Sequence, residues 1–331
     1  TKAELGWATP AWEIPSDIAD AWDQRDAGAQ RHQAWQAKLE TYRASDAALA
    51  AEFERRMSGE LPAGWSDAID SFAQDQHANP VDLETRKSSQ AAIDAVAQGL
   101  TELFGGSADL TGSNNTRWSD AQDEQYMSFG VREFGMTAIS NGVQLHGGYR
   151  PFTGTFLIFM EYARNAVRLA ALMQLPNIFV YTHDSVAVGE DGPTHQPVEQ
   201  LANLRTTPNL ATWRQCDTVE TAVAWKSAMA SRTMPTALVL TRQKVLAQAR
   251  SEAAFANVKR GCYVLYEPDE LPHILLIATG SEVSITMEAA ESLLAQGIAA
   301  RVVSMPCVEV FEMQDAEYRE SVLPVSVRAR V

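Results

Sequence analysis

The sequence predicts an α/β protein built on a doubly wound, mostly parallel sheet, with a helical segment before it and the start of a second α/β domain after it. From about residue 83, short apolar runs alternate with helical patterns, which is typical of βαβ units. Several of these runs end abruptly in polar residues, as strands do when their carboxyl ends carry a ligand site. The length of 331 residues also exceeds what one core usually holds, so we expect at least two domains.

Residues 1–80 are expected to be helical and to link two domains. They contain five of the eight tryptophans, together with many Ala, Asp and Glu residues. Ser16 is a predicted N-cap just after Pro15, and a long helical pattern covers roughly Gln30 to Met57 before Gly59 breaks it. The tryptophans could form a ligand box, but packing against a neighbouring domain is the simpler interpretation.

Residues 81–250 carry the predicted parallel sheet. Arg86 lies at the start of a helix that runs to about Leu100. Three strand-like runs with polar tails follow, and the carboxyl ends of parallel strands meet at one edge, so we expect the tails to gather there. The runs and tails are Leu103–Phe104 before Gly105–Asp109, Ile178–Tyr181 before Thr182–Ser185, and Ala237–Leu240 before Thr241–Gln243.

Residues 251–331 are predicted to begin a second α/β domain. The last seven residues, Val325–Val331, alternate apolar and polar side chains like a strand. So few strands do not make a sheet of ordinary size, and the first residue is Thr1 rather than Met, so we expect both ends to be the ends of a fragment. The other predicted strands are Tyr263–Leu265, Ile274–Ala278 and Arg301–Met305, with a helix to about Gln296 between the last two.

The composition excludes several classes of protein. A formal net charge of −15 argues against a nucleic-acid partner, because phosphate backbones are bound by basic surfaces. No apolar run approaches the roughly 18 residues of a membrane span, so we expect no membrane role. Cys216, Cys262 and Cys307 fit no disulfide or metal spacing, which indicates buried thiols in a reducing cytoplasm. An anionic small substrate would need a local basic cluster.

Glu133 is the first candidate for chemistry. It lies at the start of a predicted helix that runs to about His146, with Met136, Ile139 and Val143 on one face. An acid there commonly complements the helix dipole, and that interpretation suffices for the residue taken alone. The chemical alternative is a carboxylate in apolar surroundings that shares a proton with a ligand nitrogen.

Phe156, Phe159 and Tyr162 recur at every third position. On one helix beginning near Leu157 they would spread over an arc of about 120°. A core stripe is the default interpretation of that spacing. The Tyr162 hydroxyl and the polar residues around it weaken this interpretation, since a buried hydroxyl needs a polar partner.

The loop from Gly189 to Pro197 is the third candidate. An Asp-Gly-Pro sequence is ordinary turn chemistry, which would make it a surface turn. However, two of the six histidines, His183 and His195, flank this loop. Their spacing does not suggest a metal site, so we interpret them as donors to a hydroxylated or phosphorylated ligand.

In combination these segments resemble the bacterial type of transketolase over nearly the whole chain. The resemblance implies that residues 1–80 are an interdomain linker, residues 81–250 the pyrimidine-binding domain and residues 251–331 the start of the C-terminal domain. It also implies transfer of a two-carbon ketol unit from a ketose phosphate to an aldose phosphate. The matching segments are Gly130–Met136, Phe156–Asn165, Tyr181–Gln200 and Arg301–Pro306.

The resemblance assigns a role to each candidate residue. Glu133 matches the glutamate that hydrogen-bonds the pyrimidine ring of thiamine diphosphate, and His195 joins it as a second catalytic residue. Phe159 would stack on that ring, with Phe156 and Tyr162 completing the pocket. The substrate-binding residues implied are Arg86, Ser113, His183 and Arg242 for the phosphate, and Asp191 and His195 for the sugar hydroxyls.

The resemblance also implies partners outside the chain. Mg²⁺ or Ca²⁺ would be held by a diphosphate-binding domain whose Gly-Asp-Gly motif does not occur here, so we expect no metal ligands in this chain. The parent enzyme would be a cytoplasmic homodimer acting on sugar phosphates, and this chain alone would be inactive. Two alternatives stay open: a related enzyme such as dihydroxyacetone synthase or deoxyxylulose phosphate synthase, or a non-catalytic binding subunit of the same fold.

Overall fold

The computed structural model describes residues 1–331 and divides into two compact units, residues 1–55 and residues 56–331. The first unit is helical, as predicted, with α1 (Ser16–Trp22), α2 (Arg25–Ser45) and α3 (Ala47–Ser58), whose last residues belong to the second unit. Its side chains are mostly exposed, and Trp12 and Trp22 are almost entirely so.

Two predicted details of the first unit are wrong. Ser16 is the first helical residue of α1 rather than its N-cap, and Pro15 takes that place without a side-chain hydrogen bond. The long helix predicted from Gln30 to Met57 is broken at Asp46, whose φ of −149° and ψ of 82° are not helical. The Asp46 carboxylate stabilises this break, because it accepts a hydrogen bond from the N–H of Leu49 at 3.0 Å and so caps α3.

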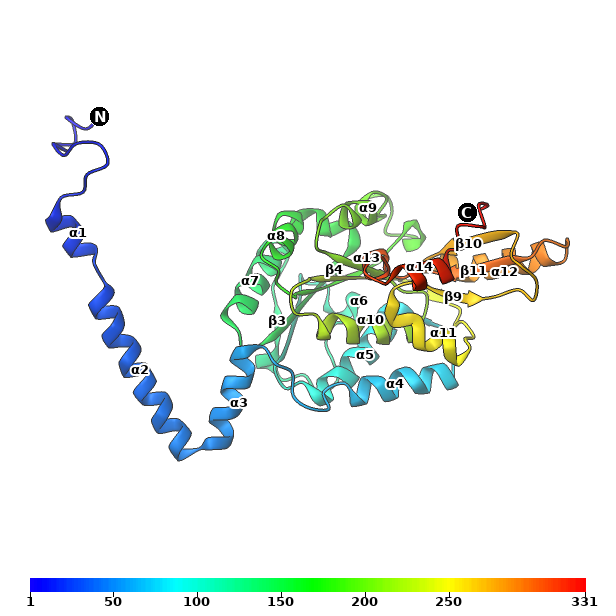
Figure 1. Ribbon diagram of the computed structural model, residues 1–331, viewed down its shortest axis with the longest axis horizontal. Coiled ribbons are helices and arrows are strands. Elements are labelled where there is room, and N and C mark those ends of the chain that lie inside the picture. Colours follow the sequence, from blue (N-terminus) through cyan, green and yellow to red (C-terminus); the bar gives the residue numbers. More distant parts are fainter. The chain divides into compact units, whose positions relative to one another are not determined.

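The second unit contains a six-stranded sheet in which every neighbouring pair is parallel, which confirms the predicted fold class (Figure 1). The strand order is β3-β2-β4-β5-β7-β6, so β4 and β5 lie at its centre. A separate antiparallel pair joins β1 (Leu83–Glu84) to β8 (Lys244–Val245). The six strands are β2 (Leu103–Ser107), β3 (Tyr126–Ser128), β4 (Arg150–Phe156), β5 (Ile178–Thr182), β6 (Ala211–Arg214) and β7 (Thr236–Leu240).

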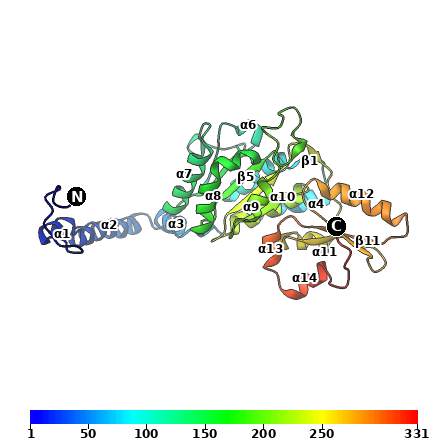
Figure 2. The same cartoon turned by 90° about the horizontal axis from the view of Figure 1, so that it is seen from above.

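Helices cover both faces of this sheet, and β5 shows why the sequence folds this way. Ile178 and Val180 of β5 lie in the core beneath α4 (Asp67–Ala78), α5 (Thr85–Gly99) and α10 (Thr218–Ala230). Phe179 and Tyr181 alternate with them and lie in the core beneath α8 (Met160–Leu172). Apolar side chains on both faces are what a parallel strand buried on both sides requires. Figure 2 shows α7 (Glu133–His146) beside α8.

The strand β2 is longer than predicted, because it continues through Gly105 and Gly106 to Ser107. We expected the polar tail to begin at Gly105. These two strand positions require glycine, because aromatic rings occupy the space that a side chain would take. A Cβ on Gly106 would lie 2.2 Å from Cε2 of Phe129, and one on Gly105 would lie 2.3 Å from Cζ of Phe152.

The second predicted α/β domain forms a three-stranded sheet of order β10-β11-β9. The strands β10 (Ile274–Ala278) and β11 (Ala300–Ser304) are parallel, and β9 (Tyr263–Tyr266) runs antiparallel to β11. The predicted strand at Val325–Val331 is wrong as a full element, because only a bridge between Arg330 and Leu275 forms. The helices of this domain are α11 (Glu252–Asn257), α12 (Glu282–Leu294), α13 (Val308–Glu312) and α14 (Ala316–Val322).

A buried polar cluster fixes this second sheet against α10. The Glu220 carboxylate accepts hydrogen bonds from the hydroxyl of Tyr263 at 2.9 Å and of Ser304 at 2.6 Å. Arg250 pairs with Asp217 at 2.6 Å, and both side chains are buried. Such a cluster is costly to break, because removing one member leaves an unpaired charge in the core.

The three cysteines are free and buried, as predicted. Burial raises the pKa of Cys216 and Cys307 well above the usual thiol value, so neither is a reactive thiolate at neutral pH. No helix in the structure combines the length and the apolar character that crossing a membrane would take.

Candidate functional site

Glu133 is the first residue of α7, as the sequence predicted, and its side chain opens onto a pocket of about 450 Å³. The residue is 8% exposed, and its carboxylate makes no hydrogen bond or ion pair within the chain. The carboxylate therefore faces the pocket with its hydrogen-bonding capacity free for a ligand, which is more than a helix-dipole interaction requires. The pocket is also lined by Ala108, Asp109, Leu110, Val131, Phe159 and Tyr162.

The three aromatic residues gather beside this pocket, but not on one helix as predicted. Phe156 ends β4, Phe159 lies in a 3₁₀ turn formed by Leu157–Phe159, and Tyr162 is in α8. Aromatic residues three positions apart occur in a helix and also where a strand passes through a turn into a helix. The spacing alone therefore wrongly predicted a single helix. The rings of Phe156 and Phe159 stack with centroids 5.7 Å apart, and Phe159 and Tyr162 lie 6.1 Å apart.

Two histidines extend this aromatic group. The His183 ring stacks on Phe156 with a centroid distance of 3.6 Å. The His195 ring lies edge-on to Phe159 at 5.2 Å and to Phe156 at 6.0 Å. The predicted pocket residues and both histidines therefore form one continuous site at the carboxyl ends of β4 and β5.

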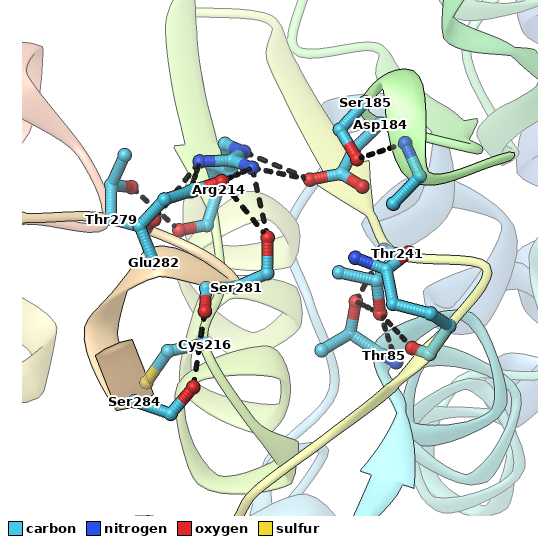
Figure 3. A network of polar contacts seen from close by, with 12 residues as sticks. Thr85, Asp184, Ser185, Arg214, Cys216, Thr241, Thr279, Ser281, Glu282 and Ser284 are labelled. Atoms are coloured by element: carbon cyan, nitrogen blue, oxygen red, sulfur yellow. Dashed lines mark hydrogen bonds and ion pairs between the residues drawn. The ribbon is translucent and has the colours of Figure 1, made fainter. Parts of the chain in front are cut away.

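Two arginines, Arg86 and Arg242, also act on His183. The start of α5 is held to the end of β7 by reciprocal hydrogen bonds between Thr85 and Thr241, of 3.0 Å and 2.7 Å, as Figure 3 shows. This places Arg86, which follows Thr85, near Arg242, which follows Thr241. Arg86 donates from Nη1 to the carbonyl of Ser113 at 2.9 Å, and Arg242 pairs with exposed Glu190 at 2.7 Å.

The electrostatics confirm that these cations act on one another. Burial, together with the charges of Arg86, Arg242 and His195, lowers the pKa of His183 to about 3. Burial also lowers the pKa of Arg86, and Arg242 contributes to that shift. The structure thus contains a local basic cluster within an acidic chain, with a neutral imidazole at its centre.

Two of the predicted site residues are less closely placed. The backbone carbonyl of Ser113 contacts Arg86, but its hydroxyl makes no hydrogen bond within the chain. Asp191 is exposed on its loop and makes no hydrogen bond or ion pair with the other candidate residues. A ligand that bridges the loop and the strand ends would be needed to bring Asp191 into the same site.

Sequence reasoning missed the network behind His183. Arg214, the last residue of β6, donates from Nε to Asp184 at 2.9 Å and from Nη1 to the carbonyl of Thr279 at 2.9 Å. It also pairs with Glu282 at the start of α12, as Figure 3 shows. An arginine at the end of a buried strand was the available signal, but its partners are up to 68 residues away in the sequence.

The donor set fits the pyrimidine ring of thiamine diphosphate and does not resemble a metal site. The Glu133 carboxylate has no partner within the chain and could hydrogen-bond a ring nitrogen. The Phe159 ring beside it offers a stacking surface. The structure has no group of three or more His, Cys, Asp or Glu side chains placed to hold a metal ion.

Comparison with protein families gives three matches along the chain. Residues 81–247 match the pyrimidine binding domain of transketolase, and residues 261–331 match the transketolase-like C-terminal domain. Residues 1–62 match the thiamine diphosphate binding domain of transketolase. The last match covers much of the segment for which the sequence predicted an interdomain linker.

Curated relatives agree with these matches. The chain is 53% identical to transketolase 1 of Vibrio vulnificus (strain YJ016), covering 99% of this chain and 50% of the relative. It is 50% identical to transketolase 1 of Aliivibrio fischeri, covering 100% of this chain and 51% of the relative. The chain therefore spans about half the length of the curated relatives it matches.

Solved structures give the same result. A transketolase from Pichia stipitis in complex with sedoheptulose 7-phosphate is 37% identical, with a TM-score of 0.86 over 97% of this chain and 49% of that one. A transketolase from Leishmania mexicana is 40% identical, with a TM-score of 0.86 over 100% and 49%. A split-gene transketolase, described as an inactive β4 tetramer, is 26% identical, with a TM-score of 0.57 over 69% and 72%. Taken with the family matches, these similarities show that the chain belongs to the transketolase family.

Proposed function

We propose that this chain supplies the pyrimidine-binding and substrate-binding side of a transketolase. The reaction is transfer of a two-carbon ketol unit from a ketose phosphate to an aldose phosphate, with thiamine diphosphate as cofactor, as in the pentose phosphate pathway. The observation that carries the proposal is the buried, unpaired Glu133 in a pocket walled by Phe159 and Tyr162, next to a cluster of cationic side chains.

Glu133 is the proposed catalytic acid on the cofactor side. When bound, thiamine diphosphate supplies the electron sink that allows a carbon-carbon bond to break. The Glu133 carboxylate, kept apart from other polar groups, holds a proton between itself and a pyrimidine nitrogen. Phe159, supported by the stacked ring of Phe156, would offer its face to the pyrimidine ring, and Tyr162 would line the pocket beside it.

The basic cluster is the proposed phosphate site. Arg86 and Arg242 bring positive charge to the carboxyl end of the sheet, and guanidinium groups suit the geometry of phosphate oxygens. His183 adds a neutral donor, and Ser113 offers a hydroxyl that is unpaired within the chain. These contacts would orient the substrate, because its phosphate is fixed far from the reacting carbonyl.

His195 is the proposed second catalytic residue. Its ring centroid lies 5.2 Å from that of Phe159, the residue assigned to the cofactor, and it also acts electrostatically on His183 of the basic cluster. From there it can hold or move a proton on a substrate oxygen. Asp191, exposed on the loop from Gly189 to Pro197, would accept a hydrogen bond from a sugar hydroxyl.

The domain organisation is proposed as residues 1–80, 81–250 and 251–331. The family matches to residues 81–247 and 261–331 support the last two domains.

We further propose that Mg²⁺ or Ca²⁺ binds with the cofactor diphosphate on the other half of a transketolase, and that the enzyme is cytoplasmic.

A homodimer is the proposed assembly of the whole enzyme. Support comes from apolar side chains exposed on and beside α7 and α8, including Val131 at 76%, Phe134 at 51% and Leu172 at 67%. The solved split-gene transketolase, to which this chain is 26% identical, is described as an inactive β4 tetramer. We therefore propose that the 331 residues alone do not turn over substrate.

The test joins this chain to the diphosphate-binding half of the Vibrio vulnificus relative, to which it is 53% identical. With thiamine diphosphate, Mg²⁺, xylulose 5-phosphate and ribose 5-phosphate, the joined protein should form product, whereas the 331-residue chain should not. Arg86→Ala should raise KM for both sugar phosphates with a smaller change in kcat. A folded joined protein that binds the cofactor but transfers no ketol unit to any sugar phosphate would contradict the proposal.

A further inference from the structure

A chain of four buried polar side chains leads from β2 to His183. The N–H of Leu110 donates to Oγ of Ser107 at 3.2 Å, and Ser107 donates to Oδ1 of Asn114 at 3.0 Å. Nδ2 of Asn114 donates to Oγ1 of Thr182 at 2.6 Å, and that oxygen lies 2.8 Å from Nδ1 of His183. The side chains of Ser107, Asn114 and Thr182 are fully buried.

The direction of the protons in this chain follows from its first member. A backbone N–H can only donate, so Ser107 must accept from Leu110 and can then give its own proton to Asn114. The carbonyl oxygen of the Asn114 amide therefore faces Ser107, and its NH₂ faces Thr182. Having accepted from Asn114, Thr182 has its hydroxyl proton left for Nδ1 of His183.

The reverse direction leaves buried protons without acceptors. If the Asn114 amide were turned over, Ser107 would accept from both Leu110 and Asn114, and its hydroxyl proton would have no partner. If Nδ1 of His183 were protonated, Thr182 would accept twice and its own proton would be unpaired. Each unpaired buried group costs about 1–3 kcal/mol, so the forward direction is favoured.

We propose that Asn114 and Thr182 are positioning residues that hold His183 in the single tautomer with its proton on Nε2, so that it presents an N–H donor to a phosphate oxygen. Nε2 makes no hydrogen bond within the chain and is left for a ligand. The ring cannot turn freely, because it stacks on Phe156 at 3.6 Å. The left-handed backbone conformation of His183, with φ of 61°, sets the direction in which its side chain leaves the main chain.

The neutral state of the ring is consistent with its surroundings. The charged groups that act on His183 are Arg86, Arg242 and His195, and all of them disfavour a second proton. An N–H donor that carries no charge binds an anion without adding to the repulsion among these cations. The proposal rests on the proposed function only for the identity of the ligand, a sugar phosphate, and not for the tautomer.

The tautomer can be measured on the 331-residue chain without substrate. Histidine labelled with ¹⁵N gives different nitrogen shifts for protonated and unprotonated ring positions, and His183→Gln identifies the signals of His183. At neutral pH we expect Nε2 to show the protonated shift and Nδ1 the unprotonated one, as a single species. Protonated Nδ1, or a mixture of tautomers, in the unaltered chain would overturn the proposal.

Two variants separate positioning from folding. Thr182→Val keeps the shape of the side chain but removes the hydroxyl, so the single tautomer should give way to a mixture. Thr182→Ser keeps the hydroxyl and should restore the single tautomer. An unchanged His183 spectrum in a folded Thr182→Val chain would show that the hydrogen-bond chain does not select the tautomer.

Addition of inorganic phosphate distinguishes this inference from the proposed function. Phosphate should shift the Nε2 signal of His183 in the unaltered chain and shift it less in the Thr182→Val chain. If phosphate leaves Nε2 unmoved while the single tautomer is observed, the tautomer inference stands and the phosphate-binding role of His183 fails.

Discussion

At the residue scale, the site depends on charged and polar side chains that are buried with a specific partner or none. Glu133 has none, His183 is kept neutral, and Asp184 forms an ion pair with Arg214 through one carboxylate oxygen, Oδ2. Each of these side chains can be altered singly, so the folding of the chain and its proposed chemistry can be tested separately.

The burial of His183 makes stability depend on pH. Its pKa falls from 6.5 to about 3 in the folded chain, so below pH 6.5 the unfolded chain takes up a proton that the folded chain does not. The contribution of His183 to stability is therefore complete above pH 6.5 and is lost progressively toward pH 3.

Thermal unfolding of the unaltered chain and of His183→Gln across this range checks the effect. The Tm of the unaltered chain should fall more steeply than that of the variant between pH 6.5 and 4. Parallel Tm curves for the two proteins would show that His183 titrates normally in the folded state.

Arg214 is predicted to be the strongest single support behind the site. Burial raises the pKa of Asp184, and the Arg214 charge opposes that shift. Arg214→Met should lower the free energy of unfolding by about 3–5 kcal/mol, because it leaves Asp184 as an unpaired buried acid.

The matched control is the double variant Arg214→Met with Asp184→Asn, which removes the unpaired charge and should recover part of the loss. Urea unfolding measures both proteins. If Arg214→Met alone unfolds at the same urea concentration as the unaltered chain, the pair does not support the strand ends.

At the scale of elements, the sequence predicted the helix that carries Glu133 with its correct ends, because a turn-forming glycine precedes a clear apolar period. It failed at Phe156, since the same spacing of aromatic residues crosses from β4 into a 3₁₀ turn. It also could not find the link from Asn114 to Thr182, which joins residues 68 apart and follows no periodic signal.

The glycines of β2 offer a test at this scale. Gly106→Ala would place a Cβ 2.2 Å from the Phe129 ring and 2.5 Å from the Met127 carbonyl oxygen. Backbone must move to make room, so we expect a loss of about 1–3 kcal/mol in the free energy of unfolding.

Gly112→Ala is the control, because a Cβ there meets no heavy atom within 4 Å and the backbone needs no positive φ. It should leave the unfolding midpoint nearly unchanged. Equal midpoints for the two variants would mean that β2 and Phe129 are not packed as the structure shows.

At the scale of the whole molecule, the family resemblance assigned the role that local patterns left open. The spacing of aromatic residues and a helix-start acid were each compatible with an ordinary core. The parallel sheet, the buried acid and the basic cluster then placed these residues in one site, as the carboxyl ends of parallel strands require. The sequence alone could not show how the loop bearing Asp191 approaches that site, because a surface loop has no packing pattern to read.

The chain spans about half the length of its curated relatives, so the proposed chemistry belongs to a larger assembly. Within the 331 residues the central claim is that Glu133 is the acid that serves the cofactor ring. Its carboxylate opens onto a pocket of about 450 Å³ and makes no hydrogen bond within the chain, which leaves it available to a ligand.

The most direct test is the rate of ketol transfer by the joined enzyme with Glu133 and with Glu133→Gln, measured at saturating thiamine diphosphate. Gln keeps the size of the side chain but cannot share the proton in the same way, so the rate should fall by roughly 10²-fold or more. Equal rates for the two proteins would contradict the assignment of Glu133 and with it the proposed site.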